Sequence, residues 1–158
     1  MTPQAPDMTP EWREDWDAWS RPFGTAICPH LERLHDSVPT LIGAMACTDD
    51  GLNIAATGID TSQVGKLAAL SSSVFAVAKA HREGIDPTKD VGSTTVNIGD
   101  SEFQCVLQRL TVPHLGHILL VLAARDVSLG ALLVATRSAG REIRETLARH
   151  TPDGSPTQ

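Results

Sequence analysis

The sequence predicts an α+β domain in which one five-stranded antiparallel sheet is built in the element order α-β-β-α-β-β-β-α. Short links at residues 48–51, 99–101 and 112–116 join apolar runs of strand length. Strands connected by such links pair as antiparallel neighbours. A long proline-free segment starts at Thr61 and separates the first two strands from the last three, as a helix does. The chain of 158 residues suffices for one domain, and an aromatic content of 4% leaves Ala, Val, Leu and Ile to form the core.

The beginning of the sequence is a polar leader that carries all three tryptophans. Thr9-Pro10-Glu11 is typical of a helix start, with threonine as the N-cap, and we expect this short helix to end before Pro22. Trp12, Trp16 and Trp19 are spaced so that they share one face of the helix, while acidic residues occupy other positions. Two interpretations remain open. The aromatic stripe packs against the protein itself, or it is a partner-binding element that enters a groove of another protein.

A second helix is expected over residues 30–38, where Leu31, Leu34 and Val38 have helical spacing and Pro39 follows. The apolar runs 41–47 and 52–56 then surround an Asp-Asp-Gly turn, which is a β-hairpin signal. We expect three further strands at 93–98, 102–110 and 117–124, and a final helix over about 128–150. The domain organisation is therefore an extension at 1–27, a folded domain at 28–150 and a polar tail at 151–158.

The middle helix, from Thr61 to about residue 83 with Gly84 as its stop, has an unusual composition. Between Leu67 and Ala78 it carries no charged residue, and small side chains cover much of its circumference. A helix on the surface normally has one apolar face and one charged face. This one is expected to be covered on two sides, by its own sheet and by another protein surface, and we interpret it as a self-association surface.

Motifs that could carry chemistry do not meet the requirements of their sites. Gly65-Lys66 near a helix start suggests a phosphate-binding loop, but Asp60 stands where the first glycine should be and Leu67 where a magnesium ligand should be. His114 and His117 form a close histidine pair without further zinc ligands nearby in the sequence. We expect no catalytic residue, no metal site and no cofactor, and therefore a protein that is not an enzyme.

Charge and cysteine content limit the partners and the location. The formal net charge of −6 argues against nucleic acid or an anionic membrane as the main partner, and no apolar run is long enough for membrane insertion. Cys28, Cys47 and Cys105 form no CxxC pair, so they are expected to be reduced thiols. These features favour a cytoplasmic protein.

Several segments together resemble the roadblock/dynein light chain family. They are the hairpin Thr48-Asp49-Asp50-Gly51-Leu52-Asn53-Ile54-Ala55, the small-residue helix after it, the strand Leu120-Val121-Leu122-Ala123-Ala124 and the start of the last helix at Asp126-Val127-Ser128-Leu129-Gly130. The resemblance covers about residues 31–147 and is greatest to the bacterial MglB-like single-domain members. The tryptophan leader lies outside the family pattern.

The resemblance implies a roadblock/profilin-like sheet with strand order 2-1-5-4-3, sandwiched between the long middle helix and the two terminal helices. It also implies a homodimer that pairs through the middle helix and the third strand, which would protect an edge strand from aggregation. The residues that this places at the dimer interface are Leu67, Leu70, Ser71, Val74, Phe75, Ala78, Thr94, Val96 and Ile98.

Bacterial relatives bind small Ras-like GTPases, so the resemblance implies a non-catalytic homodimeric regulator or scaffold for such a GTPase. In one form of this hypothesis the protein is a GTPase-activating protein that positions the switch residues of the GTPase itself, since no arginine stands out as a finger. Two alternatives remain. The protein is a dimeric adaptor that joins other proteins without any GTPase, or it is a small-ligand sensor with a polar-lined pocket.

Overall fold

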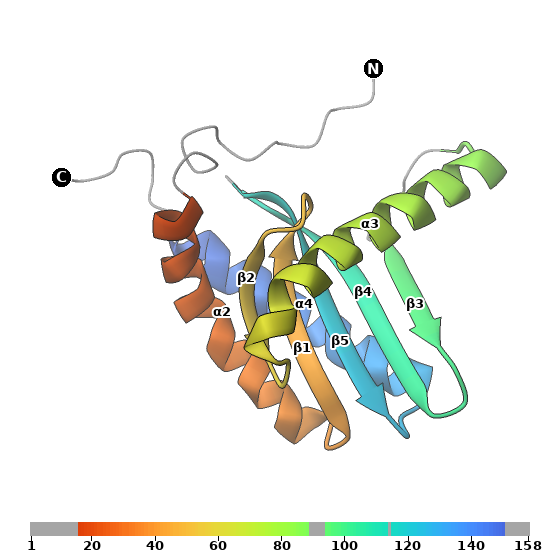
Figure 1. Cartoon of the computed structure of the whole chain (residues 1–158), viewed down its shortest axis with the longest axis horizontal. Coiled ribbons are helices and arrows are strands. Elements are labelled where there is room, and N and C mark those ends of the chain that lie inside the picture. Colours follow the sequence, from red (N-terminus) through yellow and green to blue (C-terminus); the bar gives the residue numbers. More distant parts are fainter. Residues whose placement is uncertain (1–15, 89–93, 114, 151–158) are drawn as a thin grey trace.

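The computed structural model describes residues 16–88, 94–113 and 115–150, and the elements along them follow the expected order (Figure 1). The helices and strands are α2 (Trp16–Ser37), β1 (Leu41–Thr48), β2 (Asn53–Thr57), α3 (Thr61–Ile85), β3 (Thr95–Gly99), β4 (Phe103–Val112), β5 (Gly116–Arg125) and α4 (Leu129–His150). The strands form one sheet in the order β2-β1-β5-β4-β3, and every neighbouring pair is antiparallel. The predicted fold class and strand order are confirmed.

The sheet has unequal cover on its two faces. Helices α2 and α4 lie side by side on one face, whereas α3 crosses the other face diagonally (Figure 1). The main core lies under α2 and α4, where Ile27, Leu31, Leu122, Leu132 and Ile143 are fully buried. The α3 face has a smaller core, made of Met45, Cys47, Ala68, Phe75, Leu107 and Leu119.

The expected break in the first helical region is wrong, because α2 is one continuous helix that contains Pro22 and Pro29. An interior proline costs a helix about 3 kcal/mol. Both prolines are exposed, however, and an apolar stripe on the opposite side is buried in the core. Each such side chain contributes about 1.5 to 3 kcal/mol on burial. Tertiary packing therefore outweighs the two prolines, and this stripe consists of Phe23, Ile27, Leu31, Leu34 and the following Val38.

Helix α3 begins where the sequence predicted and extends slightly further than expected, to Ile85. Asp60 is its N-cap, and its carboxylate accepts a hydrogen bond of 2.9 Å from the backbone N–H of Ser62. The expected stop, Gly84, lies inside the last turn, and the helix ends before the bend that leads to β3. Only three residues of α3 are buried by the rest of the chain: Ala68, Ser71 and Phe75.

Simple dimensions explain why the α3 face stays partly uncovered. Five strands about 4.8 Å apart span about 20 Å. An α-helix with its side chains is about 10 to 12 Å wide. Two helices therefore cover the α2/α4 face, but one helix leaves a strip of the opposite face without cover. In Figure 1 this strip lies below α3, over the lower ends of β5, β4 and β3.

Candidate functional site

The uncovered strip forms a groove of about 430 Å³ beside α3, which we call the α3 groove. Its helix side consists of Leu67, Leu70, Ser71 and Val74. Its strand side consists of Ile42, Gly43, Met45, Ile59, Ile98, Phe103, Cys105, Leu107, Val121 and Ala123. Ser71 is the one hydroxyl group among these side chains, so the groove offers almost no hydrogen bonds to a polar ligand.

Large apolar side chains at the rim of the α3 groove are exposed to solvent. Leu70 is 48% exposed, Ile98 is 46% exposed and Ile42 is 39% exposed. Val77, further along α3, is 68% exposed. A contiguous exposed apolar surface of this kind is typical of a protein–protein interface, whereas isolated apolar residues are common on any surface.

The edge of the sheet next to this groove is open. Within the described residues β3 pairs with β4 alone, from Thr95 opposite Gln108 to Gly99 opposite Gln104. Val96 packs on the small core of the α3 face and Ile98 lines the groove, so both point to the same side of the sheet. The outer backbone groups of β3 are therefore available to another strand, directly beside an apolar surface.

The opposite edge of the sheet is protected by its own chain. Helix α2 packs against β2 so closely that a Cβ atom at Gly24 would lie 2.7 Å from the backbone oxygen of Ile54. The glycine allows this approach, because any other residue would force the helix and the strand apart. Among the described residues, no helix packs as closely on β3, which makes β3 the more accessible of the two edges.

The residues that the sequence assigned to the dimer interface fall into two groups. Leu67, Leu70, Ser71, Val74 and Ile98 line the α3 groove, and they are brought together although Ile98 is far from the others in the sequence. The second group lies elsewhere. Thr94 precedes β3, Ala78 is half-buried on α3, Val96 packs on the small core and Phe75 is 2% exposed within that core. The interface assignment itself stays a prediction.

Phe75 anchors α3 to the sheet. Its ring lies among the buried residues of the small core, and the guanidinium carbon of Arg109 is 5.6 Å from the ring centre. A guanidinium over an aromatic face is attracted by the ring quadrupole. This contact places the charged end of Arg109 on the α3 face of the sheet.

Apart from Ile98, the sequence interpretation did not include the strand side of the α3 groove. Phe103, Cys105 and Leu107 alternate along β4, and Val121 and Ala123 alternate along β5, which is the period of one sheet face. That alternation was visible in the sequence. Which face it belonged to, and whether a helix would cover it, depends on the diagonal course of α3.

The chemistry available at this surface is limited. Burial raises the pKa of the Cys105 thiol to about 11 and that of the Cys47 thiol, near Asp49 and Asp50, to about 12. Both thiols are therefore protonated at neutral pH and are weak nucleophiles. The hydroxyl of Ser72 donates to the backbone oxygen of Asp49 at 2.5 Å, so this side chain serves to hold the turn against the helix.

The described part of the chain has neither a metal-binding cluster nor a membrane-spanning helix. Residues 16–88, 94–113 and 115–150 contain no group of three or more His, Cys, Asp or Glu side chains that could hold a metal ion. None of the described helices combines the length and the hydropathy needed to cross a bilayer.

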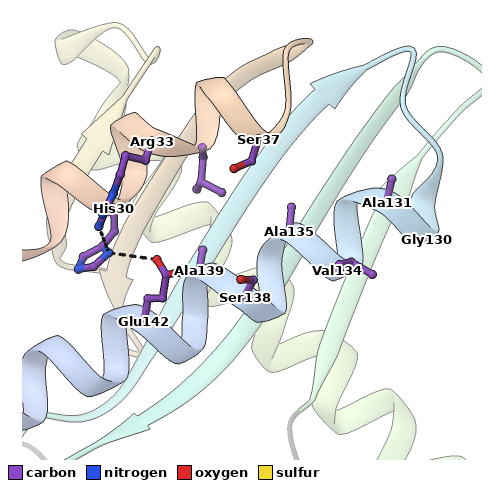
Figure 2. A pocket seen from close by; sticks show the side chains of 11 residues that line it. His30, Arg33, Ser37, Gly130, Ala131, Val134, Ala135, Ser138, Ala139 and Glu142 are labelled. Atoms are coloured by element: carbon purple, nitrogen blue, oxygen red, sulfur yellow. Dashed lines mark hydrogen bonds and ion pairs between the residues drawn. The ribbon is translucent and has the colours of Figure 1, made fainter.

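A second cavity, of about 490 Å³, lies between α2 and α4 (Figure 2). Gly130, Ala131, Ala135 and Ala139 form much of its α4 wall, and its polar end is built around His30. The Nε2 atom of His30 is 2.8 Å from the hydroxyl of Thr146. Figure 2 shows that Arg33 and Glu142 both reach the Nδ1 atom of this ring, at 2.7 Å and 3.4 Å. Nδ1 has one hydrogen-bonding position and so serves either Arg33 or Glu142 at a time. The His30–Thr146 contact joins α2 to α4, so this group serves helix packing.

The tryptophans assigned to partner binding cannot be placed as side chains. Trp12 lies outside the described residues. Trp16 and Trp19 belong to the first turn of α2 by their backbone, while their side chains are outside the description. The two interpretations of the aromatic stripe therefore both remain open.

Neither a protein-family model nor a curated protein sequence matches the chain. Solved structures match it in shape. The roadblock/LC7 domain from Streptomyces avermitilis has a TM-score of 0.63 at 21% identity, over 75% of this chain and 94% of that one. MglB of Myxococcus xanthus has a TM-score of 0.64 at 16% identity, over 83% and 94% of the two chains. A structure described as MglB with a tetrameric arrangement has the same TM-score and identity, over 81% and 91%. The chain therefore has the roadblock fold, as the sequence resemblance implied.

Proposed function

We propose that the protein is a non-catalytic, homodimeric regulator or scaffold of the roadblock type that binds a small Ras-like GTPase. The observation that carries this proposal is the adjacency of the apolar α3 groove and the open edge of β3 on one side of the sheet. One partner can cover both features at once. A second copy of the chain offers the same two features in return.

The dimer follows from self-complementarity. In a two-fold dimer, residues of one surface meet the same surface of the other copy. The outer edge of β3 would pair antiparallel with the partner's β3, which satisfies the free backbone groups and extends the sheet. Helix α3 of the partner would then lie in the α3 groove, and its small side chains would permit close approach. Leu70 and Ile98, which are about half exposed in the single chain, would become buried.

The GTPase partner is supported by similarity. The sequence resembles MglB-like regulators of Ras-like GTPases, and the fold matches solved MglB structures at 14 to 16% identity. The proposed mode of action is binding, because the described residues around the α3 groove supply apolar contacts and one protonated thiol, that of Cys105. If hydrolysis is accelerated, we expect the dimer to order the switch residues of the GTPase, as the location of the Arg109 guanidinium over Phe75 leaves it little freedom to act as a finger.

The proposal is tested in two steps. Sedimentation equilibrium of the purified protein should show a dimer, and exchange of Leu70 for Asp should dissociate it. The protein is then used as bait in lysate of its own organism, with GDP or a non-hydrolysable GTP analogue. Recovery of a small GTPase in one nucleotide state by the parent chain, and its loss with the Leu70→Asp chain, supports the regulator.

One result would contradict the GTPase proposal, and another would contradict its dependence on the dimer surface. Recovery of the same non-GTPase proteins in both nucleotide states would indicate a dimeric adaptor. A GTPase recovered equally by the dimeric chain and by a monomeric Leu70→Asp chain would show that the dimer surface is not what it recognises. Val134→Asp is the matched control, because Val134 is also an exposed apolar residue, at 67%, but lies on α4 on the opposite face of the sheet.

A further inference from the structure

A pocket of about 260 Å³ between α4 and β4 carries an unusual concentration of positive charge. Arg137, Arg141 and Arg144 line it from α4, and Gln108 lines it from β4. The three arginines are spaced at i, i+4 and i+7, so they project from the same side of the helix. We call this the arginine pocket. It lies on the flank of α4 that faces β4, whereas the cavity of Figure 2 lies on the flank that faces α2.

The three arginines of this pocket have no ion-pair partner among the described residues. The chain as a whole has 19 acidic against 13 basic residues. Even so, no carboxylate of the described residues forms an ion pair with Arg137, Arg141 or Arg144. Ion pairs are instead formed between His30 and Glu142 and between Lys79 and Glu83. Three unpaired guanidinium groups in one concave surface produce a local positive potential on an otherwise acidic protein.

Gln108 places a buried amide in the wall of the arginine pocket. This side chain is only 6% exposed, and its Oε1 atom is buried without a hydrogen-bond partner. A buried amide oxygen without a hydrogen-bond donor is energetically unfavourable. Gly140 of α4 leaves room for this amide, because a Cβ atom at that position would lie 3.3 Å from Oε1. The free position on Oε1 is an acceptor, so the group that it can receive is an N–H of a neighbouring arginine and not a phosphate oxygen.

A glutamine amide can serve an anion site with either end. Its nitrogen can donate to an oxyanion, and its oxygen can accept an N–H of a neighbouring guanidinium and so orient it. Arg109 also lines the pocket, but its guanidinium carbon lies 5.6 Å from the ring centre of Phe75 on the other face of the sheet. The binding charge is therefore that of the three α4 arginines.

We propose that Arg137, Arg141, Arg144 and Gln108 form a binding site for a ligand with two or more linked phosphoryl groups. Guanidinium groups bind phosphate oxygens through two parallel hydrogen bonds. A phosphoryl group carries a charge of about −1.5 to −2, so two of them match three arginines. Seven residues of helix extend about 10 Å, a length that linked phosphoryl groups can follow more fully than one can. The site is complete in a single chain and does not depend on the proposed dimer or GTPase.

The test is isothermal titration calorimetry of the full chain with sodium pyrophosphate at low ionic strength. We expect saturable binding with a stoichiometry of one per chain. Arg141→Gln should weaken it about five- to tenfold, since a hydrogen bond to a charged group is lost at an exposed position. Arg149→Gln is the matched control, because Arg149 is an exposed arginine of α4 outside the pocket, and it should leave the affinity unchanged.

Further titrations identify the ligand and the role of the amide. GDP binding as tightly as pyrophosphate, with the same loss in Arg141→Gln, would extend the ligand class to nucleoside diphosphates, whereas pyrophosphate binding alone would restrict it to free phosphates. Gln108→Leu should weaken binding without lowering the melting temperature, because it removes an orphaned polar group. No saturable binding of pyrophosphate, or equal losses in Arg141→Gln and Arg149→Gln, would overturn the proposal. An unchanged affinity in Gln108→Leu would overturn the assignment of the amide.

Discussion

Replacing Leu70 by Asp should dissociate the proposed dimer while leaving the fold of each chain intact. Leu70 is 48% exposed in the single chain, so a partner would bury about half of its side chain. Full burial of a leucine contributes about 1.5 to 3 kcal/mol, which gives about 0.7 to 1.4 kcal/mol for the remaining half. A two-fold dimer contains this contact twice, and the loss is therefore about 1.5 to 3 kcal/mol. Because 1.4 kcal/mol is a factor of ten, the dimer dissociation constant should rise about 10- to 100-fold from lost burial alone.

The carboxylate adds to this effect, since two charged groups would be placed in an apolar groove without a cation. Sedimentation equilibrium over a dilution series measures both dissociation constants, and circular dichroism checks that the variant is folded. The control is Val134→Asp, which places the same charge on an exposed apolar site of α4. The reasoning is refuted if Leu70→Asp and Val134→Asp have the same dissociation constant as the parent chain, or if the parent chain is a monomer at all concentrations.

Three further outcomes are expected. Burial raises the folded-state pKa of Cys47 to about 12, against an ordinary value of 9.0. This thiol therefore contributes stability below pH 9 that is lost as the pH rises towards 12. Urea unfolding at several pH values should show that decline in stability, and Cys47→Ala should flatten it. Gly24→Ala should lower the free energy of unfolding by about 1 to 3 kcal/mol, because its Cβ would meet the backbone oxygen of Ile54 at 2.7 Å. Gly65→Ala, whose Cβ would have no atom within 4 Å, should raise the free energy of unfolding by up to about 1 kcal/mol. Equal effects of the two substitutions in chemical denaturation would contradict this expectation. Intrinsic emission comes only from the three leader tryptophans, as the chain has no tyrosine, and we expect a blue-shifted maximum from docking on the protein itself; a maximum like that of free tryptophan would exclude such docking.

The sequence was sufficient to predict the order and the antiparallel pairing of the strands, and the turns between them explain why. Gly51 at the β1–β2 turn and Gly116 at the start of β5 both adopt positive φ angles, which glycine accepts readily. Glycine at these links therefore allowed the turns to be predicted from the sequence. The continuity of α2 could not be predicted in the same way. Pro22 locally indicates a helix end, and the opposing burial of Phe23 and Ile27 becomes visible only when the sheet beneath α2 is in place.

The candidate site was predictable in part for the same reason. The uncharged stretch with Leu67, Leu70 and Val74 lies within the single helix α3, so its unusual composition could be recognised from that segment of the sequence alone. The strand side of the α3 groove depends on strand order and on the diagonal course of α3, which no local pattern encodes. The burial of Gln108 is a further example, because nothing in the sequence around it distinguishes a buried amide from an exposed one.

The pairing of β1 with β5 has a consequence for how the protein is made. Leu41 to Thr48 pair with residues 118–124, and this contact joins the β1–β2 hairpin to β5, the central strand of the sheet. At about 5 to 20 residues per second, a ribosome needs several seconds to synthesise the intervening chain. Throughout that interval the nascent hairpin has no central neighbour, and such long-range pairings form late. A product that stops before β5 would expose the inner edge of β1, and it would be cleared by proteases or aggregate instead of acting as a shortened domain.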